Sequence, residues 1–270
     1  MENIEFYKKI QYPDGDFYIE LLEVKKEFIF RINNFEDLWE LNHTIDVLNY
    51  NGVVPCVTIP NLISCQADKR FKENQSFGYN LVHRFLGSLN ATFKVFHPHQ
   101  EMCTLLDSVE IIDNSEFVEK VLDRLRPINN LILMSTDGGS YKWINKIADK
   151  IGFRNEVYGA SKMRKYEDNK SKLTQVIDRQ DFQGKDILIV DDICVFGGTF
   201  KGLSKMLRER NCGKLYLAIS HMTVQNLGED PVTNYFDKVF TTNSKFDKYI
   251  EDDKINKYGQ PQNLEIIKLF

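Results

Sequence analysis

The stretch ILIVDDICVFGGTF, residues 187–200, begins as a buried strand and ends as a polar turn. Four apolar residues lead directly into Asp191 and Asp192, and the small-residue turn Gly197-Gly198-Thr199 follows. Adjacent carboxylates at the mouth of an apolar strand repel each other and lose hydration, so they predict a bound cation or polyol. A Gly-Gly-Thr turn before a helix presents backbone N–H groups and a hydroxyl to an anion. Together these features indicate a sugar phosphate, although aspartates that merely cap the next helix would fit the same pattern.

Strands and helices alternate along the chain on both sides of this stretch. Their order is typical of parallel βαβ units, so the predicted fold class is α/β, with mainly parallel sheets flanked by helices. Both halves show the same rhythm, which predicts two similar domains, residues 1–125 and 126–270. The predicted strands are 16–32 (two strands), 53–60, 92–99, 130–139, 154–163, 186–192, 214–222 and 237–244, and the predicted helices are 34–52, 76–90, 114–125, 140–152 and 199–213.

Composition excludes several classes of protein. The chain has 270 residues, of which 42% are hydrophobic and 27% charged, as in an ordinary soluble globular protein. A formal net charge of −4 offers no basic surface for nucleic acid. The sequence shows neither a signal-peptide core nor the roughly 20 apolar residues of a membrane span. Five cysteines without CxxC spacing argue against a zinc site. We therefore expect a cytoplasmic protein with no nucleic-acid or membrane partner.

Polar residues follow the predicted strands, and this is where open α/β sheets bind their ligands. His221, at the end of the strand 214–222, is expected at the same edge of the sheet. The polar strand ends are HPH (97–99), STDGG (135–139), SKMR (161–164), DDICVFGGT (191–199) and TTNS (241–244).

These motifs resemble a known family. Residues 187–199 resemble the ribose-phosphate-binding signature of type I phosphoribosyltransferases, and the chain as a whole is similar to the ribose-phosphate pyrophosphokinases (phosphoribosyl pyrophosphate synthetases). The resemblance implies two tandem type I phosphoribosyltransferase-like domains, with the ATP side in 1–125 and the ribose-phosphate loop in 126–270. The other matching pieces are YPDGDFYI (12–19), QADKRFKENQSF (66–77), FHPH (96–99), STDGGSYKW (135–143, against Ser-Pro-Asp-x-Gly-Gly) and SKMR (161–164).

The resemblance also implies a reaction. The family transfers the β,γ-diphosphoryl group of Mg-ATP to the anomeric hydroxyl of ribose 5-phosphate and releases AMP, so it implies Mg²⁺ as cofactor, ATP as co-substrate and a homo-oligomer built from dimers, up to a hexamer. The implied residues are Lys162 and Arg164 for catalysis; Tyr12, Asp14, Asp16, Gln66, Asp68, Lys69 and His99 for ATP; His99 and Asp137 for the metal; and Asp191, Asp192, Val195, Phe196, Gly197, Gly198 and Thr199 for the acceptor.

The chain departs from the family pattern in its acceptor loop. Val195 and Phe196 stand where the family usually has Asp and Thr, Gln66 and Ala67 stand where it has Arg-Gln, and His97 replaces an aspartate. One explanation is a paralogue that has lost activity and serves as a regulatory subunit. The other is an enlarged acceptor, since an aromatic ring removes a donor to a monoester phosphate and lines an open channel.

We favour ADP-ribose as that acceptor, because its 5-phosphate continues into AMP. The chain would then rebuild NAD, as a divergent, largely phage-encoded branch of the family is thought to do, and would act in a host cytoplasm. The alternative is an ordinary ribose-5-phosphate pyrophosphokinase. An inactive paralogue or a phosphoribosyltransferase is less favoured, because the metal, lysine and double-aspartate positions are all present.

Overall fold

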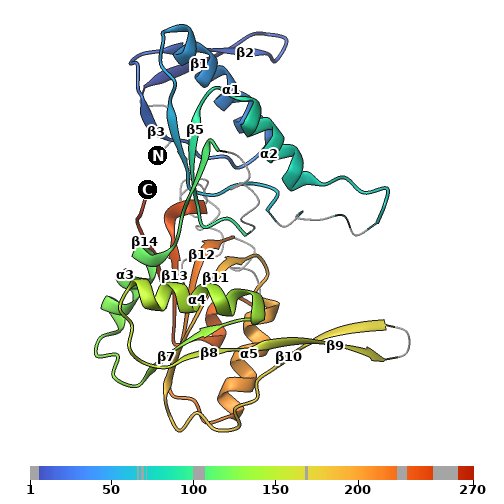
Figure 1. Ribbon diagram of the computed structural model, residues 1–270, viewed down its shortest axis with the longest axis vertical. Coiled ribbons are helices and arrows are strands. Elements are labelled where there is room, and N and C mark those ends of the chain that lie inside the picture. The colour runs from blue at the N-terminus through green and yellow to red at the C-terminus, as the bar shows by residue number, and fades with distance from the viewer. Residues whose placement is uncertain are drawn as a thin grey trace. The chain divides into compact units, whose positions relative to one another are not determined.

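A computed structural model describes residues 6–65, 67, 70, 72–99, 107–167, 170–223, 230–245 and 261–270. The chain divides into two compact units (Figure 1). The first unit comprises residues 1–113 together with Phe270, and the second comprises residues 114–269. Among the described residues, no helix has the length and hydropathy needed to span a membrane.

The first unit contains a parallel sheet and a separate antiparallel ribbon. The sheet has the strand order β3-β4-β5-β6, and every pair in it is parallel. The ribbon joins β1 and β2 with Tyr7 opposite Leu21. The elements of this unit are β1 (Tyr7–Gln11), β2 (Phe17–Leu21), β3 (Glu27–Ile29), α1 (Phe35–Tyr50), β4 (Cys56–Ile59), α2 (Gly78–Ser88), β5 (Thr92–Phe96) and β6 (Val109–Ile112).

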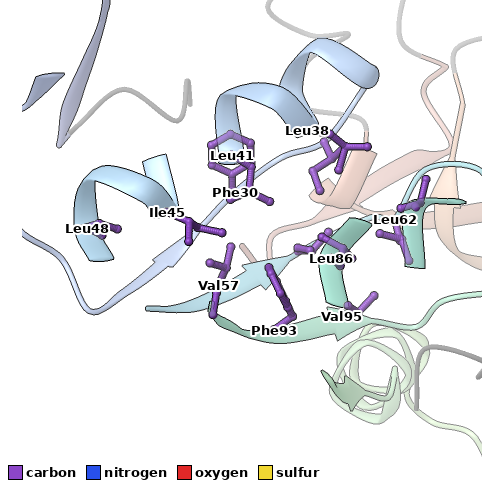
Figure 2. Close-up of a cluster of buried hydrophobic side chains, with 14 of the residues drawn as sticks. Phe30, Leu38, Leu41, Ile45, Leu48, Val57, Leu62, Leu86, Phe93 and Val95 are labelled. Carbon is purple, nitrogen blue, oxygen red and sulfur yellow. The ribbon is translucent and has the colours of Figure 1, made fainter. Parts of the chain in front are cut away.

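Helix α1 begins at a capping box and packs on the first sheet through one apolar face. The Asn34 side chain accepts a hydrogen bond from the Asp37 N–H at 3.0 Å, and the Asp37 carboxylate accepts one from the Asn34 N–H at 3.2 Å. Figure 2 shows side chains of α1 gathered over those of β4 and β5. This cluster of buried residues includes Phe30, Leu38, Leu41, Ile45, Leu48, Val57, Leu62, Leu86, Phe93 and Val95.

The second unit is built on a six-stranded parallel sheet of order β14-β13-β12-β11-β7-β8. A second antiparallel ribbon, β9 and β10, extends away from that sheet (Figure 1). The elements are α3 (Ser115–Leu125), β7 (Leu131–Ser135), α4 (Gly138–Lys150), β8 (Val157–Gly159), β9 (Ser161–Glu167), β10 (Lys170–Val176), β11 (Asp186–Cys194), α5 (Gly198–Glu209), β12 (Leu215–Met222), the 3₁₀ helix η4 (Val232–Tyr235), β13 (Lys238–Thr242) and β14 (Leu264–Ile267).

Helices cover both faces of this sheet, because successive strand residues point to opposite sides. Leu188 of β11 belongs to the core under α3 and α4. Ile189, its neighbour in the strand, belongs to the core under α5, together with Leu203 of that helix. Strand β11 is therefore apolar on both faces, as the run ILIV predicted, and the predicted α/β fold with parallel sheets flanked by helices is confirmed.

The division between the units falls earlier in the chain than the predicted domain boundary. The sequence placed the boundary between residues 125 and 126, whereas the contacts divide the chain between Asp113 and Asn114. The reason is α3: its side chains Phe117, Val118 and Val121 pack with Leu133 of β7 in the core of the second unit.

Candidate functional site

The candidate acceptor site lies where the strand order of the second sheet reverses. From β7 the chain passes to β8 on one side, and it then returns to build β11 and β12 on the other side of β7. At such a point, the connections that follow two adjacent strands run to opposite sides of the sheet. They leave a crevice outside the carboxyl ends of these strands, here β7 and β11. The residues at those ends are Thr136 and Asp137 after β7, and Asp191 and Asp192 in the last part of β11.

Asp191 is partly buried, and its carboxylate is hydrogen-bonded at both oxygens. The Thr136 hydroxyl donates to Asp191 Oδ2 at 2.6 Å, and the Asp192 N–H donates to Asp191 Oδ1 at 3.0 Å. Burial and then the neighbouring Asp192 carboxyl raise the pKa of Asp191, the Thr136 hydroxyl lowers it, and the net result is a pKa of about 7. A perturbed carboxyl at a sheet switch point is a feature of functional sites.

The turn after β11 starts α5 without a side-chain cap. Gly197 is the N-cap residue and adopts a left-handed conformation with φ of +76°, which favours glycine. Because glycine has no side chain, the N–H groups in the first turn of α5 keep their affinity for an anion. The alternative that Asp191 and Asp192 cap this helix is wrong, because β11 continues through both residues to Cys194.

The two residues that depart from the family pattern lie in this turn. Phe196 is 72% exposed, so its ring is one of the most exposed large hydrophobic side chains described. Val195 is partly buried, and its carbonyl accepts a hydrogen bond from the Thr223 hydroxyl at 3.0 Å, which ties the turn to the end of β12. Thr199 is exposed in the first turn of α5.

Asp137, a predicted metal ligand, is the N-cap residue of α4. Its Oδ1 accepts hydrogen bonds from the Ser140 N–H at 3.0 Å and from the Ser140 hydroxyl at 3.1 Å. His99, the other predicted ligand, belongs to the first unit and follows β5. Within the described ranges, no three His, Cys, Asp or Glu side chains gather as a metal site would require.

The predicted catalytic residues lie on the ribbon formed by β9 and β10. Residue 162 is opposite Gln175 and residue 164 is opposite Leu173 in its register. The structure describes the backbone of Lys162 and Arg164 and not their side chains, so their catalytic role stays a prediction.

The predicted adenine loop is the turn between β1 and β2. Tyr12 is 51% exposed, and its ring lies 5.4 Å from the ring of Tyr18. Asp14 Oδ1 accepts a hydrogen bond from the Asp16 N–H at 3.2 Å, and Gly15 has a φ of +95°. The other predicted ATP residues, Gln66, Asp68 and Lys69, lie outside the described residues.

Two further buried residues, His221 and Thr136, lie at the carboxyl edge of the second sheet. His221, which the sequence placed near this edge, is opposite Ile193 of β11 in the parallel register. Its Nδ1 lies 2.8 Å from Ser244 Oγ, and the Ser244 hydroxyl donates to the Ser220 carbonyl at 2.9 Å. Thr136 was not predicted as a site residue. Its only sequence signal was its place immediately after a buried strand.

Comparison with known proteins agrees with this architecture. A model of the phosphoribosyl transferase domain family matches residues 104–254, more than half of the chain. The ribose-phosphate pyrophosphokinase of Pyrococcus furiosus is 24% identical over 250 residues, which cover 90% of this chain and 86% of the relative. The enzyme of the same name from Thermoplasma acidophilum is 21% identical and covers 88% of this chain and 83% of its own length.

A solved structure extends the likeness to the fold of nearly the whole chain. The phosphoribosylpyrophosphate synthetase from Mycobacterium smegmatis matches with a TM-score of 0.74 and 17% identity, over 97% of this chain and 86% of that chain. Most of the residues that the domain model matches lie in the second unit, whereas the relatives and this structure span both units. The chain therefore belongs to the phosphoribosyl transferase domain family and, within it, to the ribose-phosphate pyrophosphokinases.

Proposed function

We propose that this protein transfers the β,γ-diphosphoryl group of ATP to the anomeric hydroxyl of ribose 5-phosphate, giving the 1-diphosphate and AMP. One observation carries the proposal: a carboxylate pair and an uncapped left-handed glycine turn stand together at the switch point of a parallel sheet. A ribose phosphate needs both parts, since its hydroxyls donate to carboxylates and its phosphate accepts from backbone N–H groups. The relatives are named as ribose-phosphate pyrophosphokinases, which supports the same acceptor.

In this proposal, each part of the site holds one part of the acceptor. The carboxylates of Asp191 and Asp192 accept hydrogen bonds from the 2- and 3-hydroxyls of the ribose. The turn Gly197-Gly198-Thr199 receives the 5-phosphate at the start of α5, where the helix dipole favours negative charge. The acceptor is then fixed at both ends, and its anomeric oxygen is oriented toward the donor.

The transfer forms a bond between the anomeric oxygen and the β-phosphorus of ATP. The bond from the β-phosphorus to the oxygen bridging the α-phosphate breaks, AMP departs with that electron pair, and the hydroxyl proton passes to solvent. Such a transfer depends mainly on positioning and on neutralisation of charge. We propose that Lys162 and Arg164 supply positive charge to the phosphoryl oxygens as the bond breaks.

The donor set of the second unit fits Mg²⁺. Asp137, Asp191 and Asp192 offer carboxylate oxygens, the hard ligands that Mg²⁺ prefers. The proposed ligand in this unit is Asp137, and the two aspartates of β11 hold the acceptor directly or through the ion. When bound, Mg²⁺ supplies charge neutralisation to the phosphates of ATP.

On the ATP side, we propose that the turn with Tyr12, Asp14 and Asp16 completes the adenine site of a neighbouring subunit. This role is supported by the half-exposed ring of Tyr12, which lies at the tip of the antiparallel ribbon of β1 and β2. Gln66, Asp68 and Lys69 hold ATP in the same proposal. The active form is then a homo-oligomer of at least two chains.

A second acceptor, ADP-ribose, keeps one specific observation in its favour. The exposed Phe196 ring stands where the family pattern has a threonine hydroxyl, so it offers no hydrogen bond to a phosphate and leaves the turn open on that side. The sequence favoured this acceptor. The relatives are named for ribose phosphate, so we propose ribose 5-phosphate ahead of ADP-ribose.

The test is incubation with Mg-ATP and either acceptor, with AMP release followed by chromatography and the product identified by mass. We expect AMP and a ribose 5-phosphate product that has gained the mass of a diphosphoryl group. A product formed only from ADP-ribose would reverse the order of the two acceptors. No AMP with either one would refute the diphosphotransferase.

A further inference from the structure

Thr136 occupies the position directly after β7 and faces the strand that carries the paired aspartates. Its side chain is buried, with 1% of the residue exposed. Strands β7 and β11 are parallel with Met134 opposite Ile189. Two residues further along both strands, the same register places Thr136 beside Asp191 on the same side of the sheet. The tertiary fold therefore joins residues that are 55 positions apart in the sequence.

The contact from Thr136 completes the fixation of the Asp191 carboxylate. The hydroxyl donates to Oδ2 at 2.6 Å, a length typical of hydrogen bonds from a hydroxyl to an ionised carboxylate. The other oxygen, Oδ1, accepts from the Asp192 N–H at 3.0 Å. With one donor on each oxygen, the carboxylate cannot rotate about either side-chain bond without losing a hydrogen bond.

The hydrogen bond from Thr136 also opposes the effect of the neighbouring Asp192 carboxyl on the ionisation of Asp191. Burial and the Asp192 carboxyl both disfavour the ionised form of Asp191 and raise its pKa, whereas the Thr136 hydroxyl lowers it. The ionised form accepts hydrogen bonds at both oxygens, and a diol requires such an acceptor. A donor that stabilises this form and fixes its plane prepares Asp191 for the ribose.

We propose that Thr136 is a positioning residue for the acceptor, an inference that rests on the proposed function. Its hydroxyl holds the Asp191 carboxylate in the orientation that receives the ribose hydroxyls. In the Ser-Pro-Asp pattern that this chain resembles, proline stands at this position, and a proline side chain donates no hydrogen bond. This chain thus holds its acceptor carboxylate through a hydroxyl that the pattern lacks.

The test compares Thr136→Val, which keeps the shape and removes the donor, with Thr136→Ser, which keeps the donor. The matched control is Thr44→Val, in which an equally buried threonine of α1 loses its hydrogen bond to the Glu40 carbonyl at 2.9 Å. For each protein, titration calorimetry measures the Kd for ribose 5-phosphate without ATP. Steady-state rates give kcat and the KM for each substrate.

We expect Thr136→Val to raise the Kd and KM for ribose 5-phosphate by about tenfold to a hundredfold, as for loss of a hydrogen bond to a charged group. The KM for ATP should change by less than about twofold, since ATP does not touch this carboxylate in the proposed mechanism. Thr136→Ser should restore most of the affinity for the acceptor. Thr44→Val should leave both KM values near those of the wild type.

Either of two results would contradict the positioning role of Thr136. A folded Thr136→Val enzyme with wild-type affinity for ribose 5-phosphate refutes the positioning role, as does an equal rise in both KM values. If Thr136→Val does not fold, Thr136→Ala is expected to show the same selective loss and is judged by the same criteria. A wild type that neither binds nor converts ribose 5-phosphate refutes the proposed function itself and removes this inference with it. An active wild type with an unaffected variant refutes the inference alone.

Discussion

Replacing Asp191 with asparagine should stabilise the folded protein at neutral and alkaline pH. The replacement keeps the shape of the side chain and removes its charge. The carbonyl of the new side-chain amide would accept from the Asp192 N–H, and its N–H would donate to the Thr136 oxygen, so the direction of one hydrogen bond reverses and none is lost. The buried charge and its repulsion with Asp192 disappear.

The size of the effect follows from the raised pKa. Burial, and then the Asp192 carboxyl, raise the pKa of Asp191 from 3.8 to about 7 in the folded state. A shift of about three units corresponds to about 4 kcal/mol, and relaxation around an ionised side chain reduces this to about 2–4 kcal/mol. Because the folded state retains the proton longer than the unfolded state, wild-type stability falls as the pH rises from about 4 to about 7. The asparagine variant lacks this loss.

The assay is guanidinium denaturation at several pH values between about 4 and 8, in buffer with a chelator so that no divalent cation binds the carboxyl. The fluorescence of Trp143, in α4, reports the second unit once Trp39 of α1 is replaced by Phe. Asp237→Asn is the control of opposite sign. Burial raises the pKa of Asp237, but the Leu215 N–H and Arg208 outweigh it and hold the pKa below 3.8.

The wild type and Asp191→Asn should have similar stabilities near pH 4 and separate above it, with the variant the more stable by about 2–4 kcal/mol at pH 8. Asp237→Asn should instead be less stable than the wild type across this whole range, because the stabilisation that comes with the lowered pKa of Asp237 is lost only below about pH 4. A difference between Asp191→Asn and the wild type that stays constant across the range would show that Asp191 titrates at an ordinary pKa. The reasoning about the buried pair would then be wrong.

Three further outcomes test the proposed function. Tyr12→Ala should raise the KM for ATP by about tenfold, for a lost aromatic contact worth about 1–2 kcal/mol, and a fully active monomer in sedimentation would contradict its role in a neighbouring subunit. Lys162→Ala should lower kcat much more than it changes ATP affinity measured by calorimetry, because its contact forms mainly in the transition state; an unchanged kcat would remove it from the catalytic residues. The double change Val195→Asp with Phe196→Thr should raise kcat/KM for ribose 5-phosphate relative to ADP-ribose, and an unchanged ratio would show that the loop does not choose the acceptor.

The periodicity of the chain predicted most of the elements because those signals are local. Each signal is formed by residues that are close together in the sequence. Examples are the run ILIV, the helical spacing of apolar residues in 34–52 and the glycine turn at 197–198. The elements it missed are short or lack an apolar run. Strands β6 and β14 each have four residues, and β1 is part of a ribbon that packs on α1 rather than in a sheet.

The sequence by itself thus determined the α/β class, the apolar strand β11 and the paired aspartates followed by a glycine turn. Only the tertiary structure decided which residues meet there. Parallel pairing of β7 with β11 brings Thr136 to Asp191, and the packing of α3 on the second sheet moves the division between the units to residue 113. It also decided that Asp137 caps α4 and that Asp191 does not cap α5. Strand order and register depend on contacts between distant residues, and hydrophobic periodicity carries no information about which strands become neighbours.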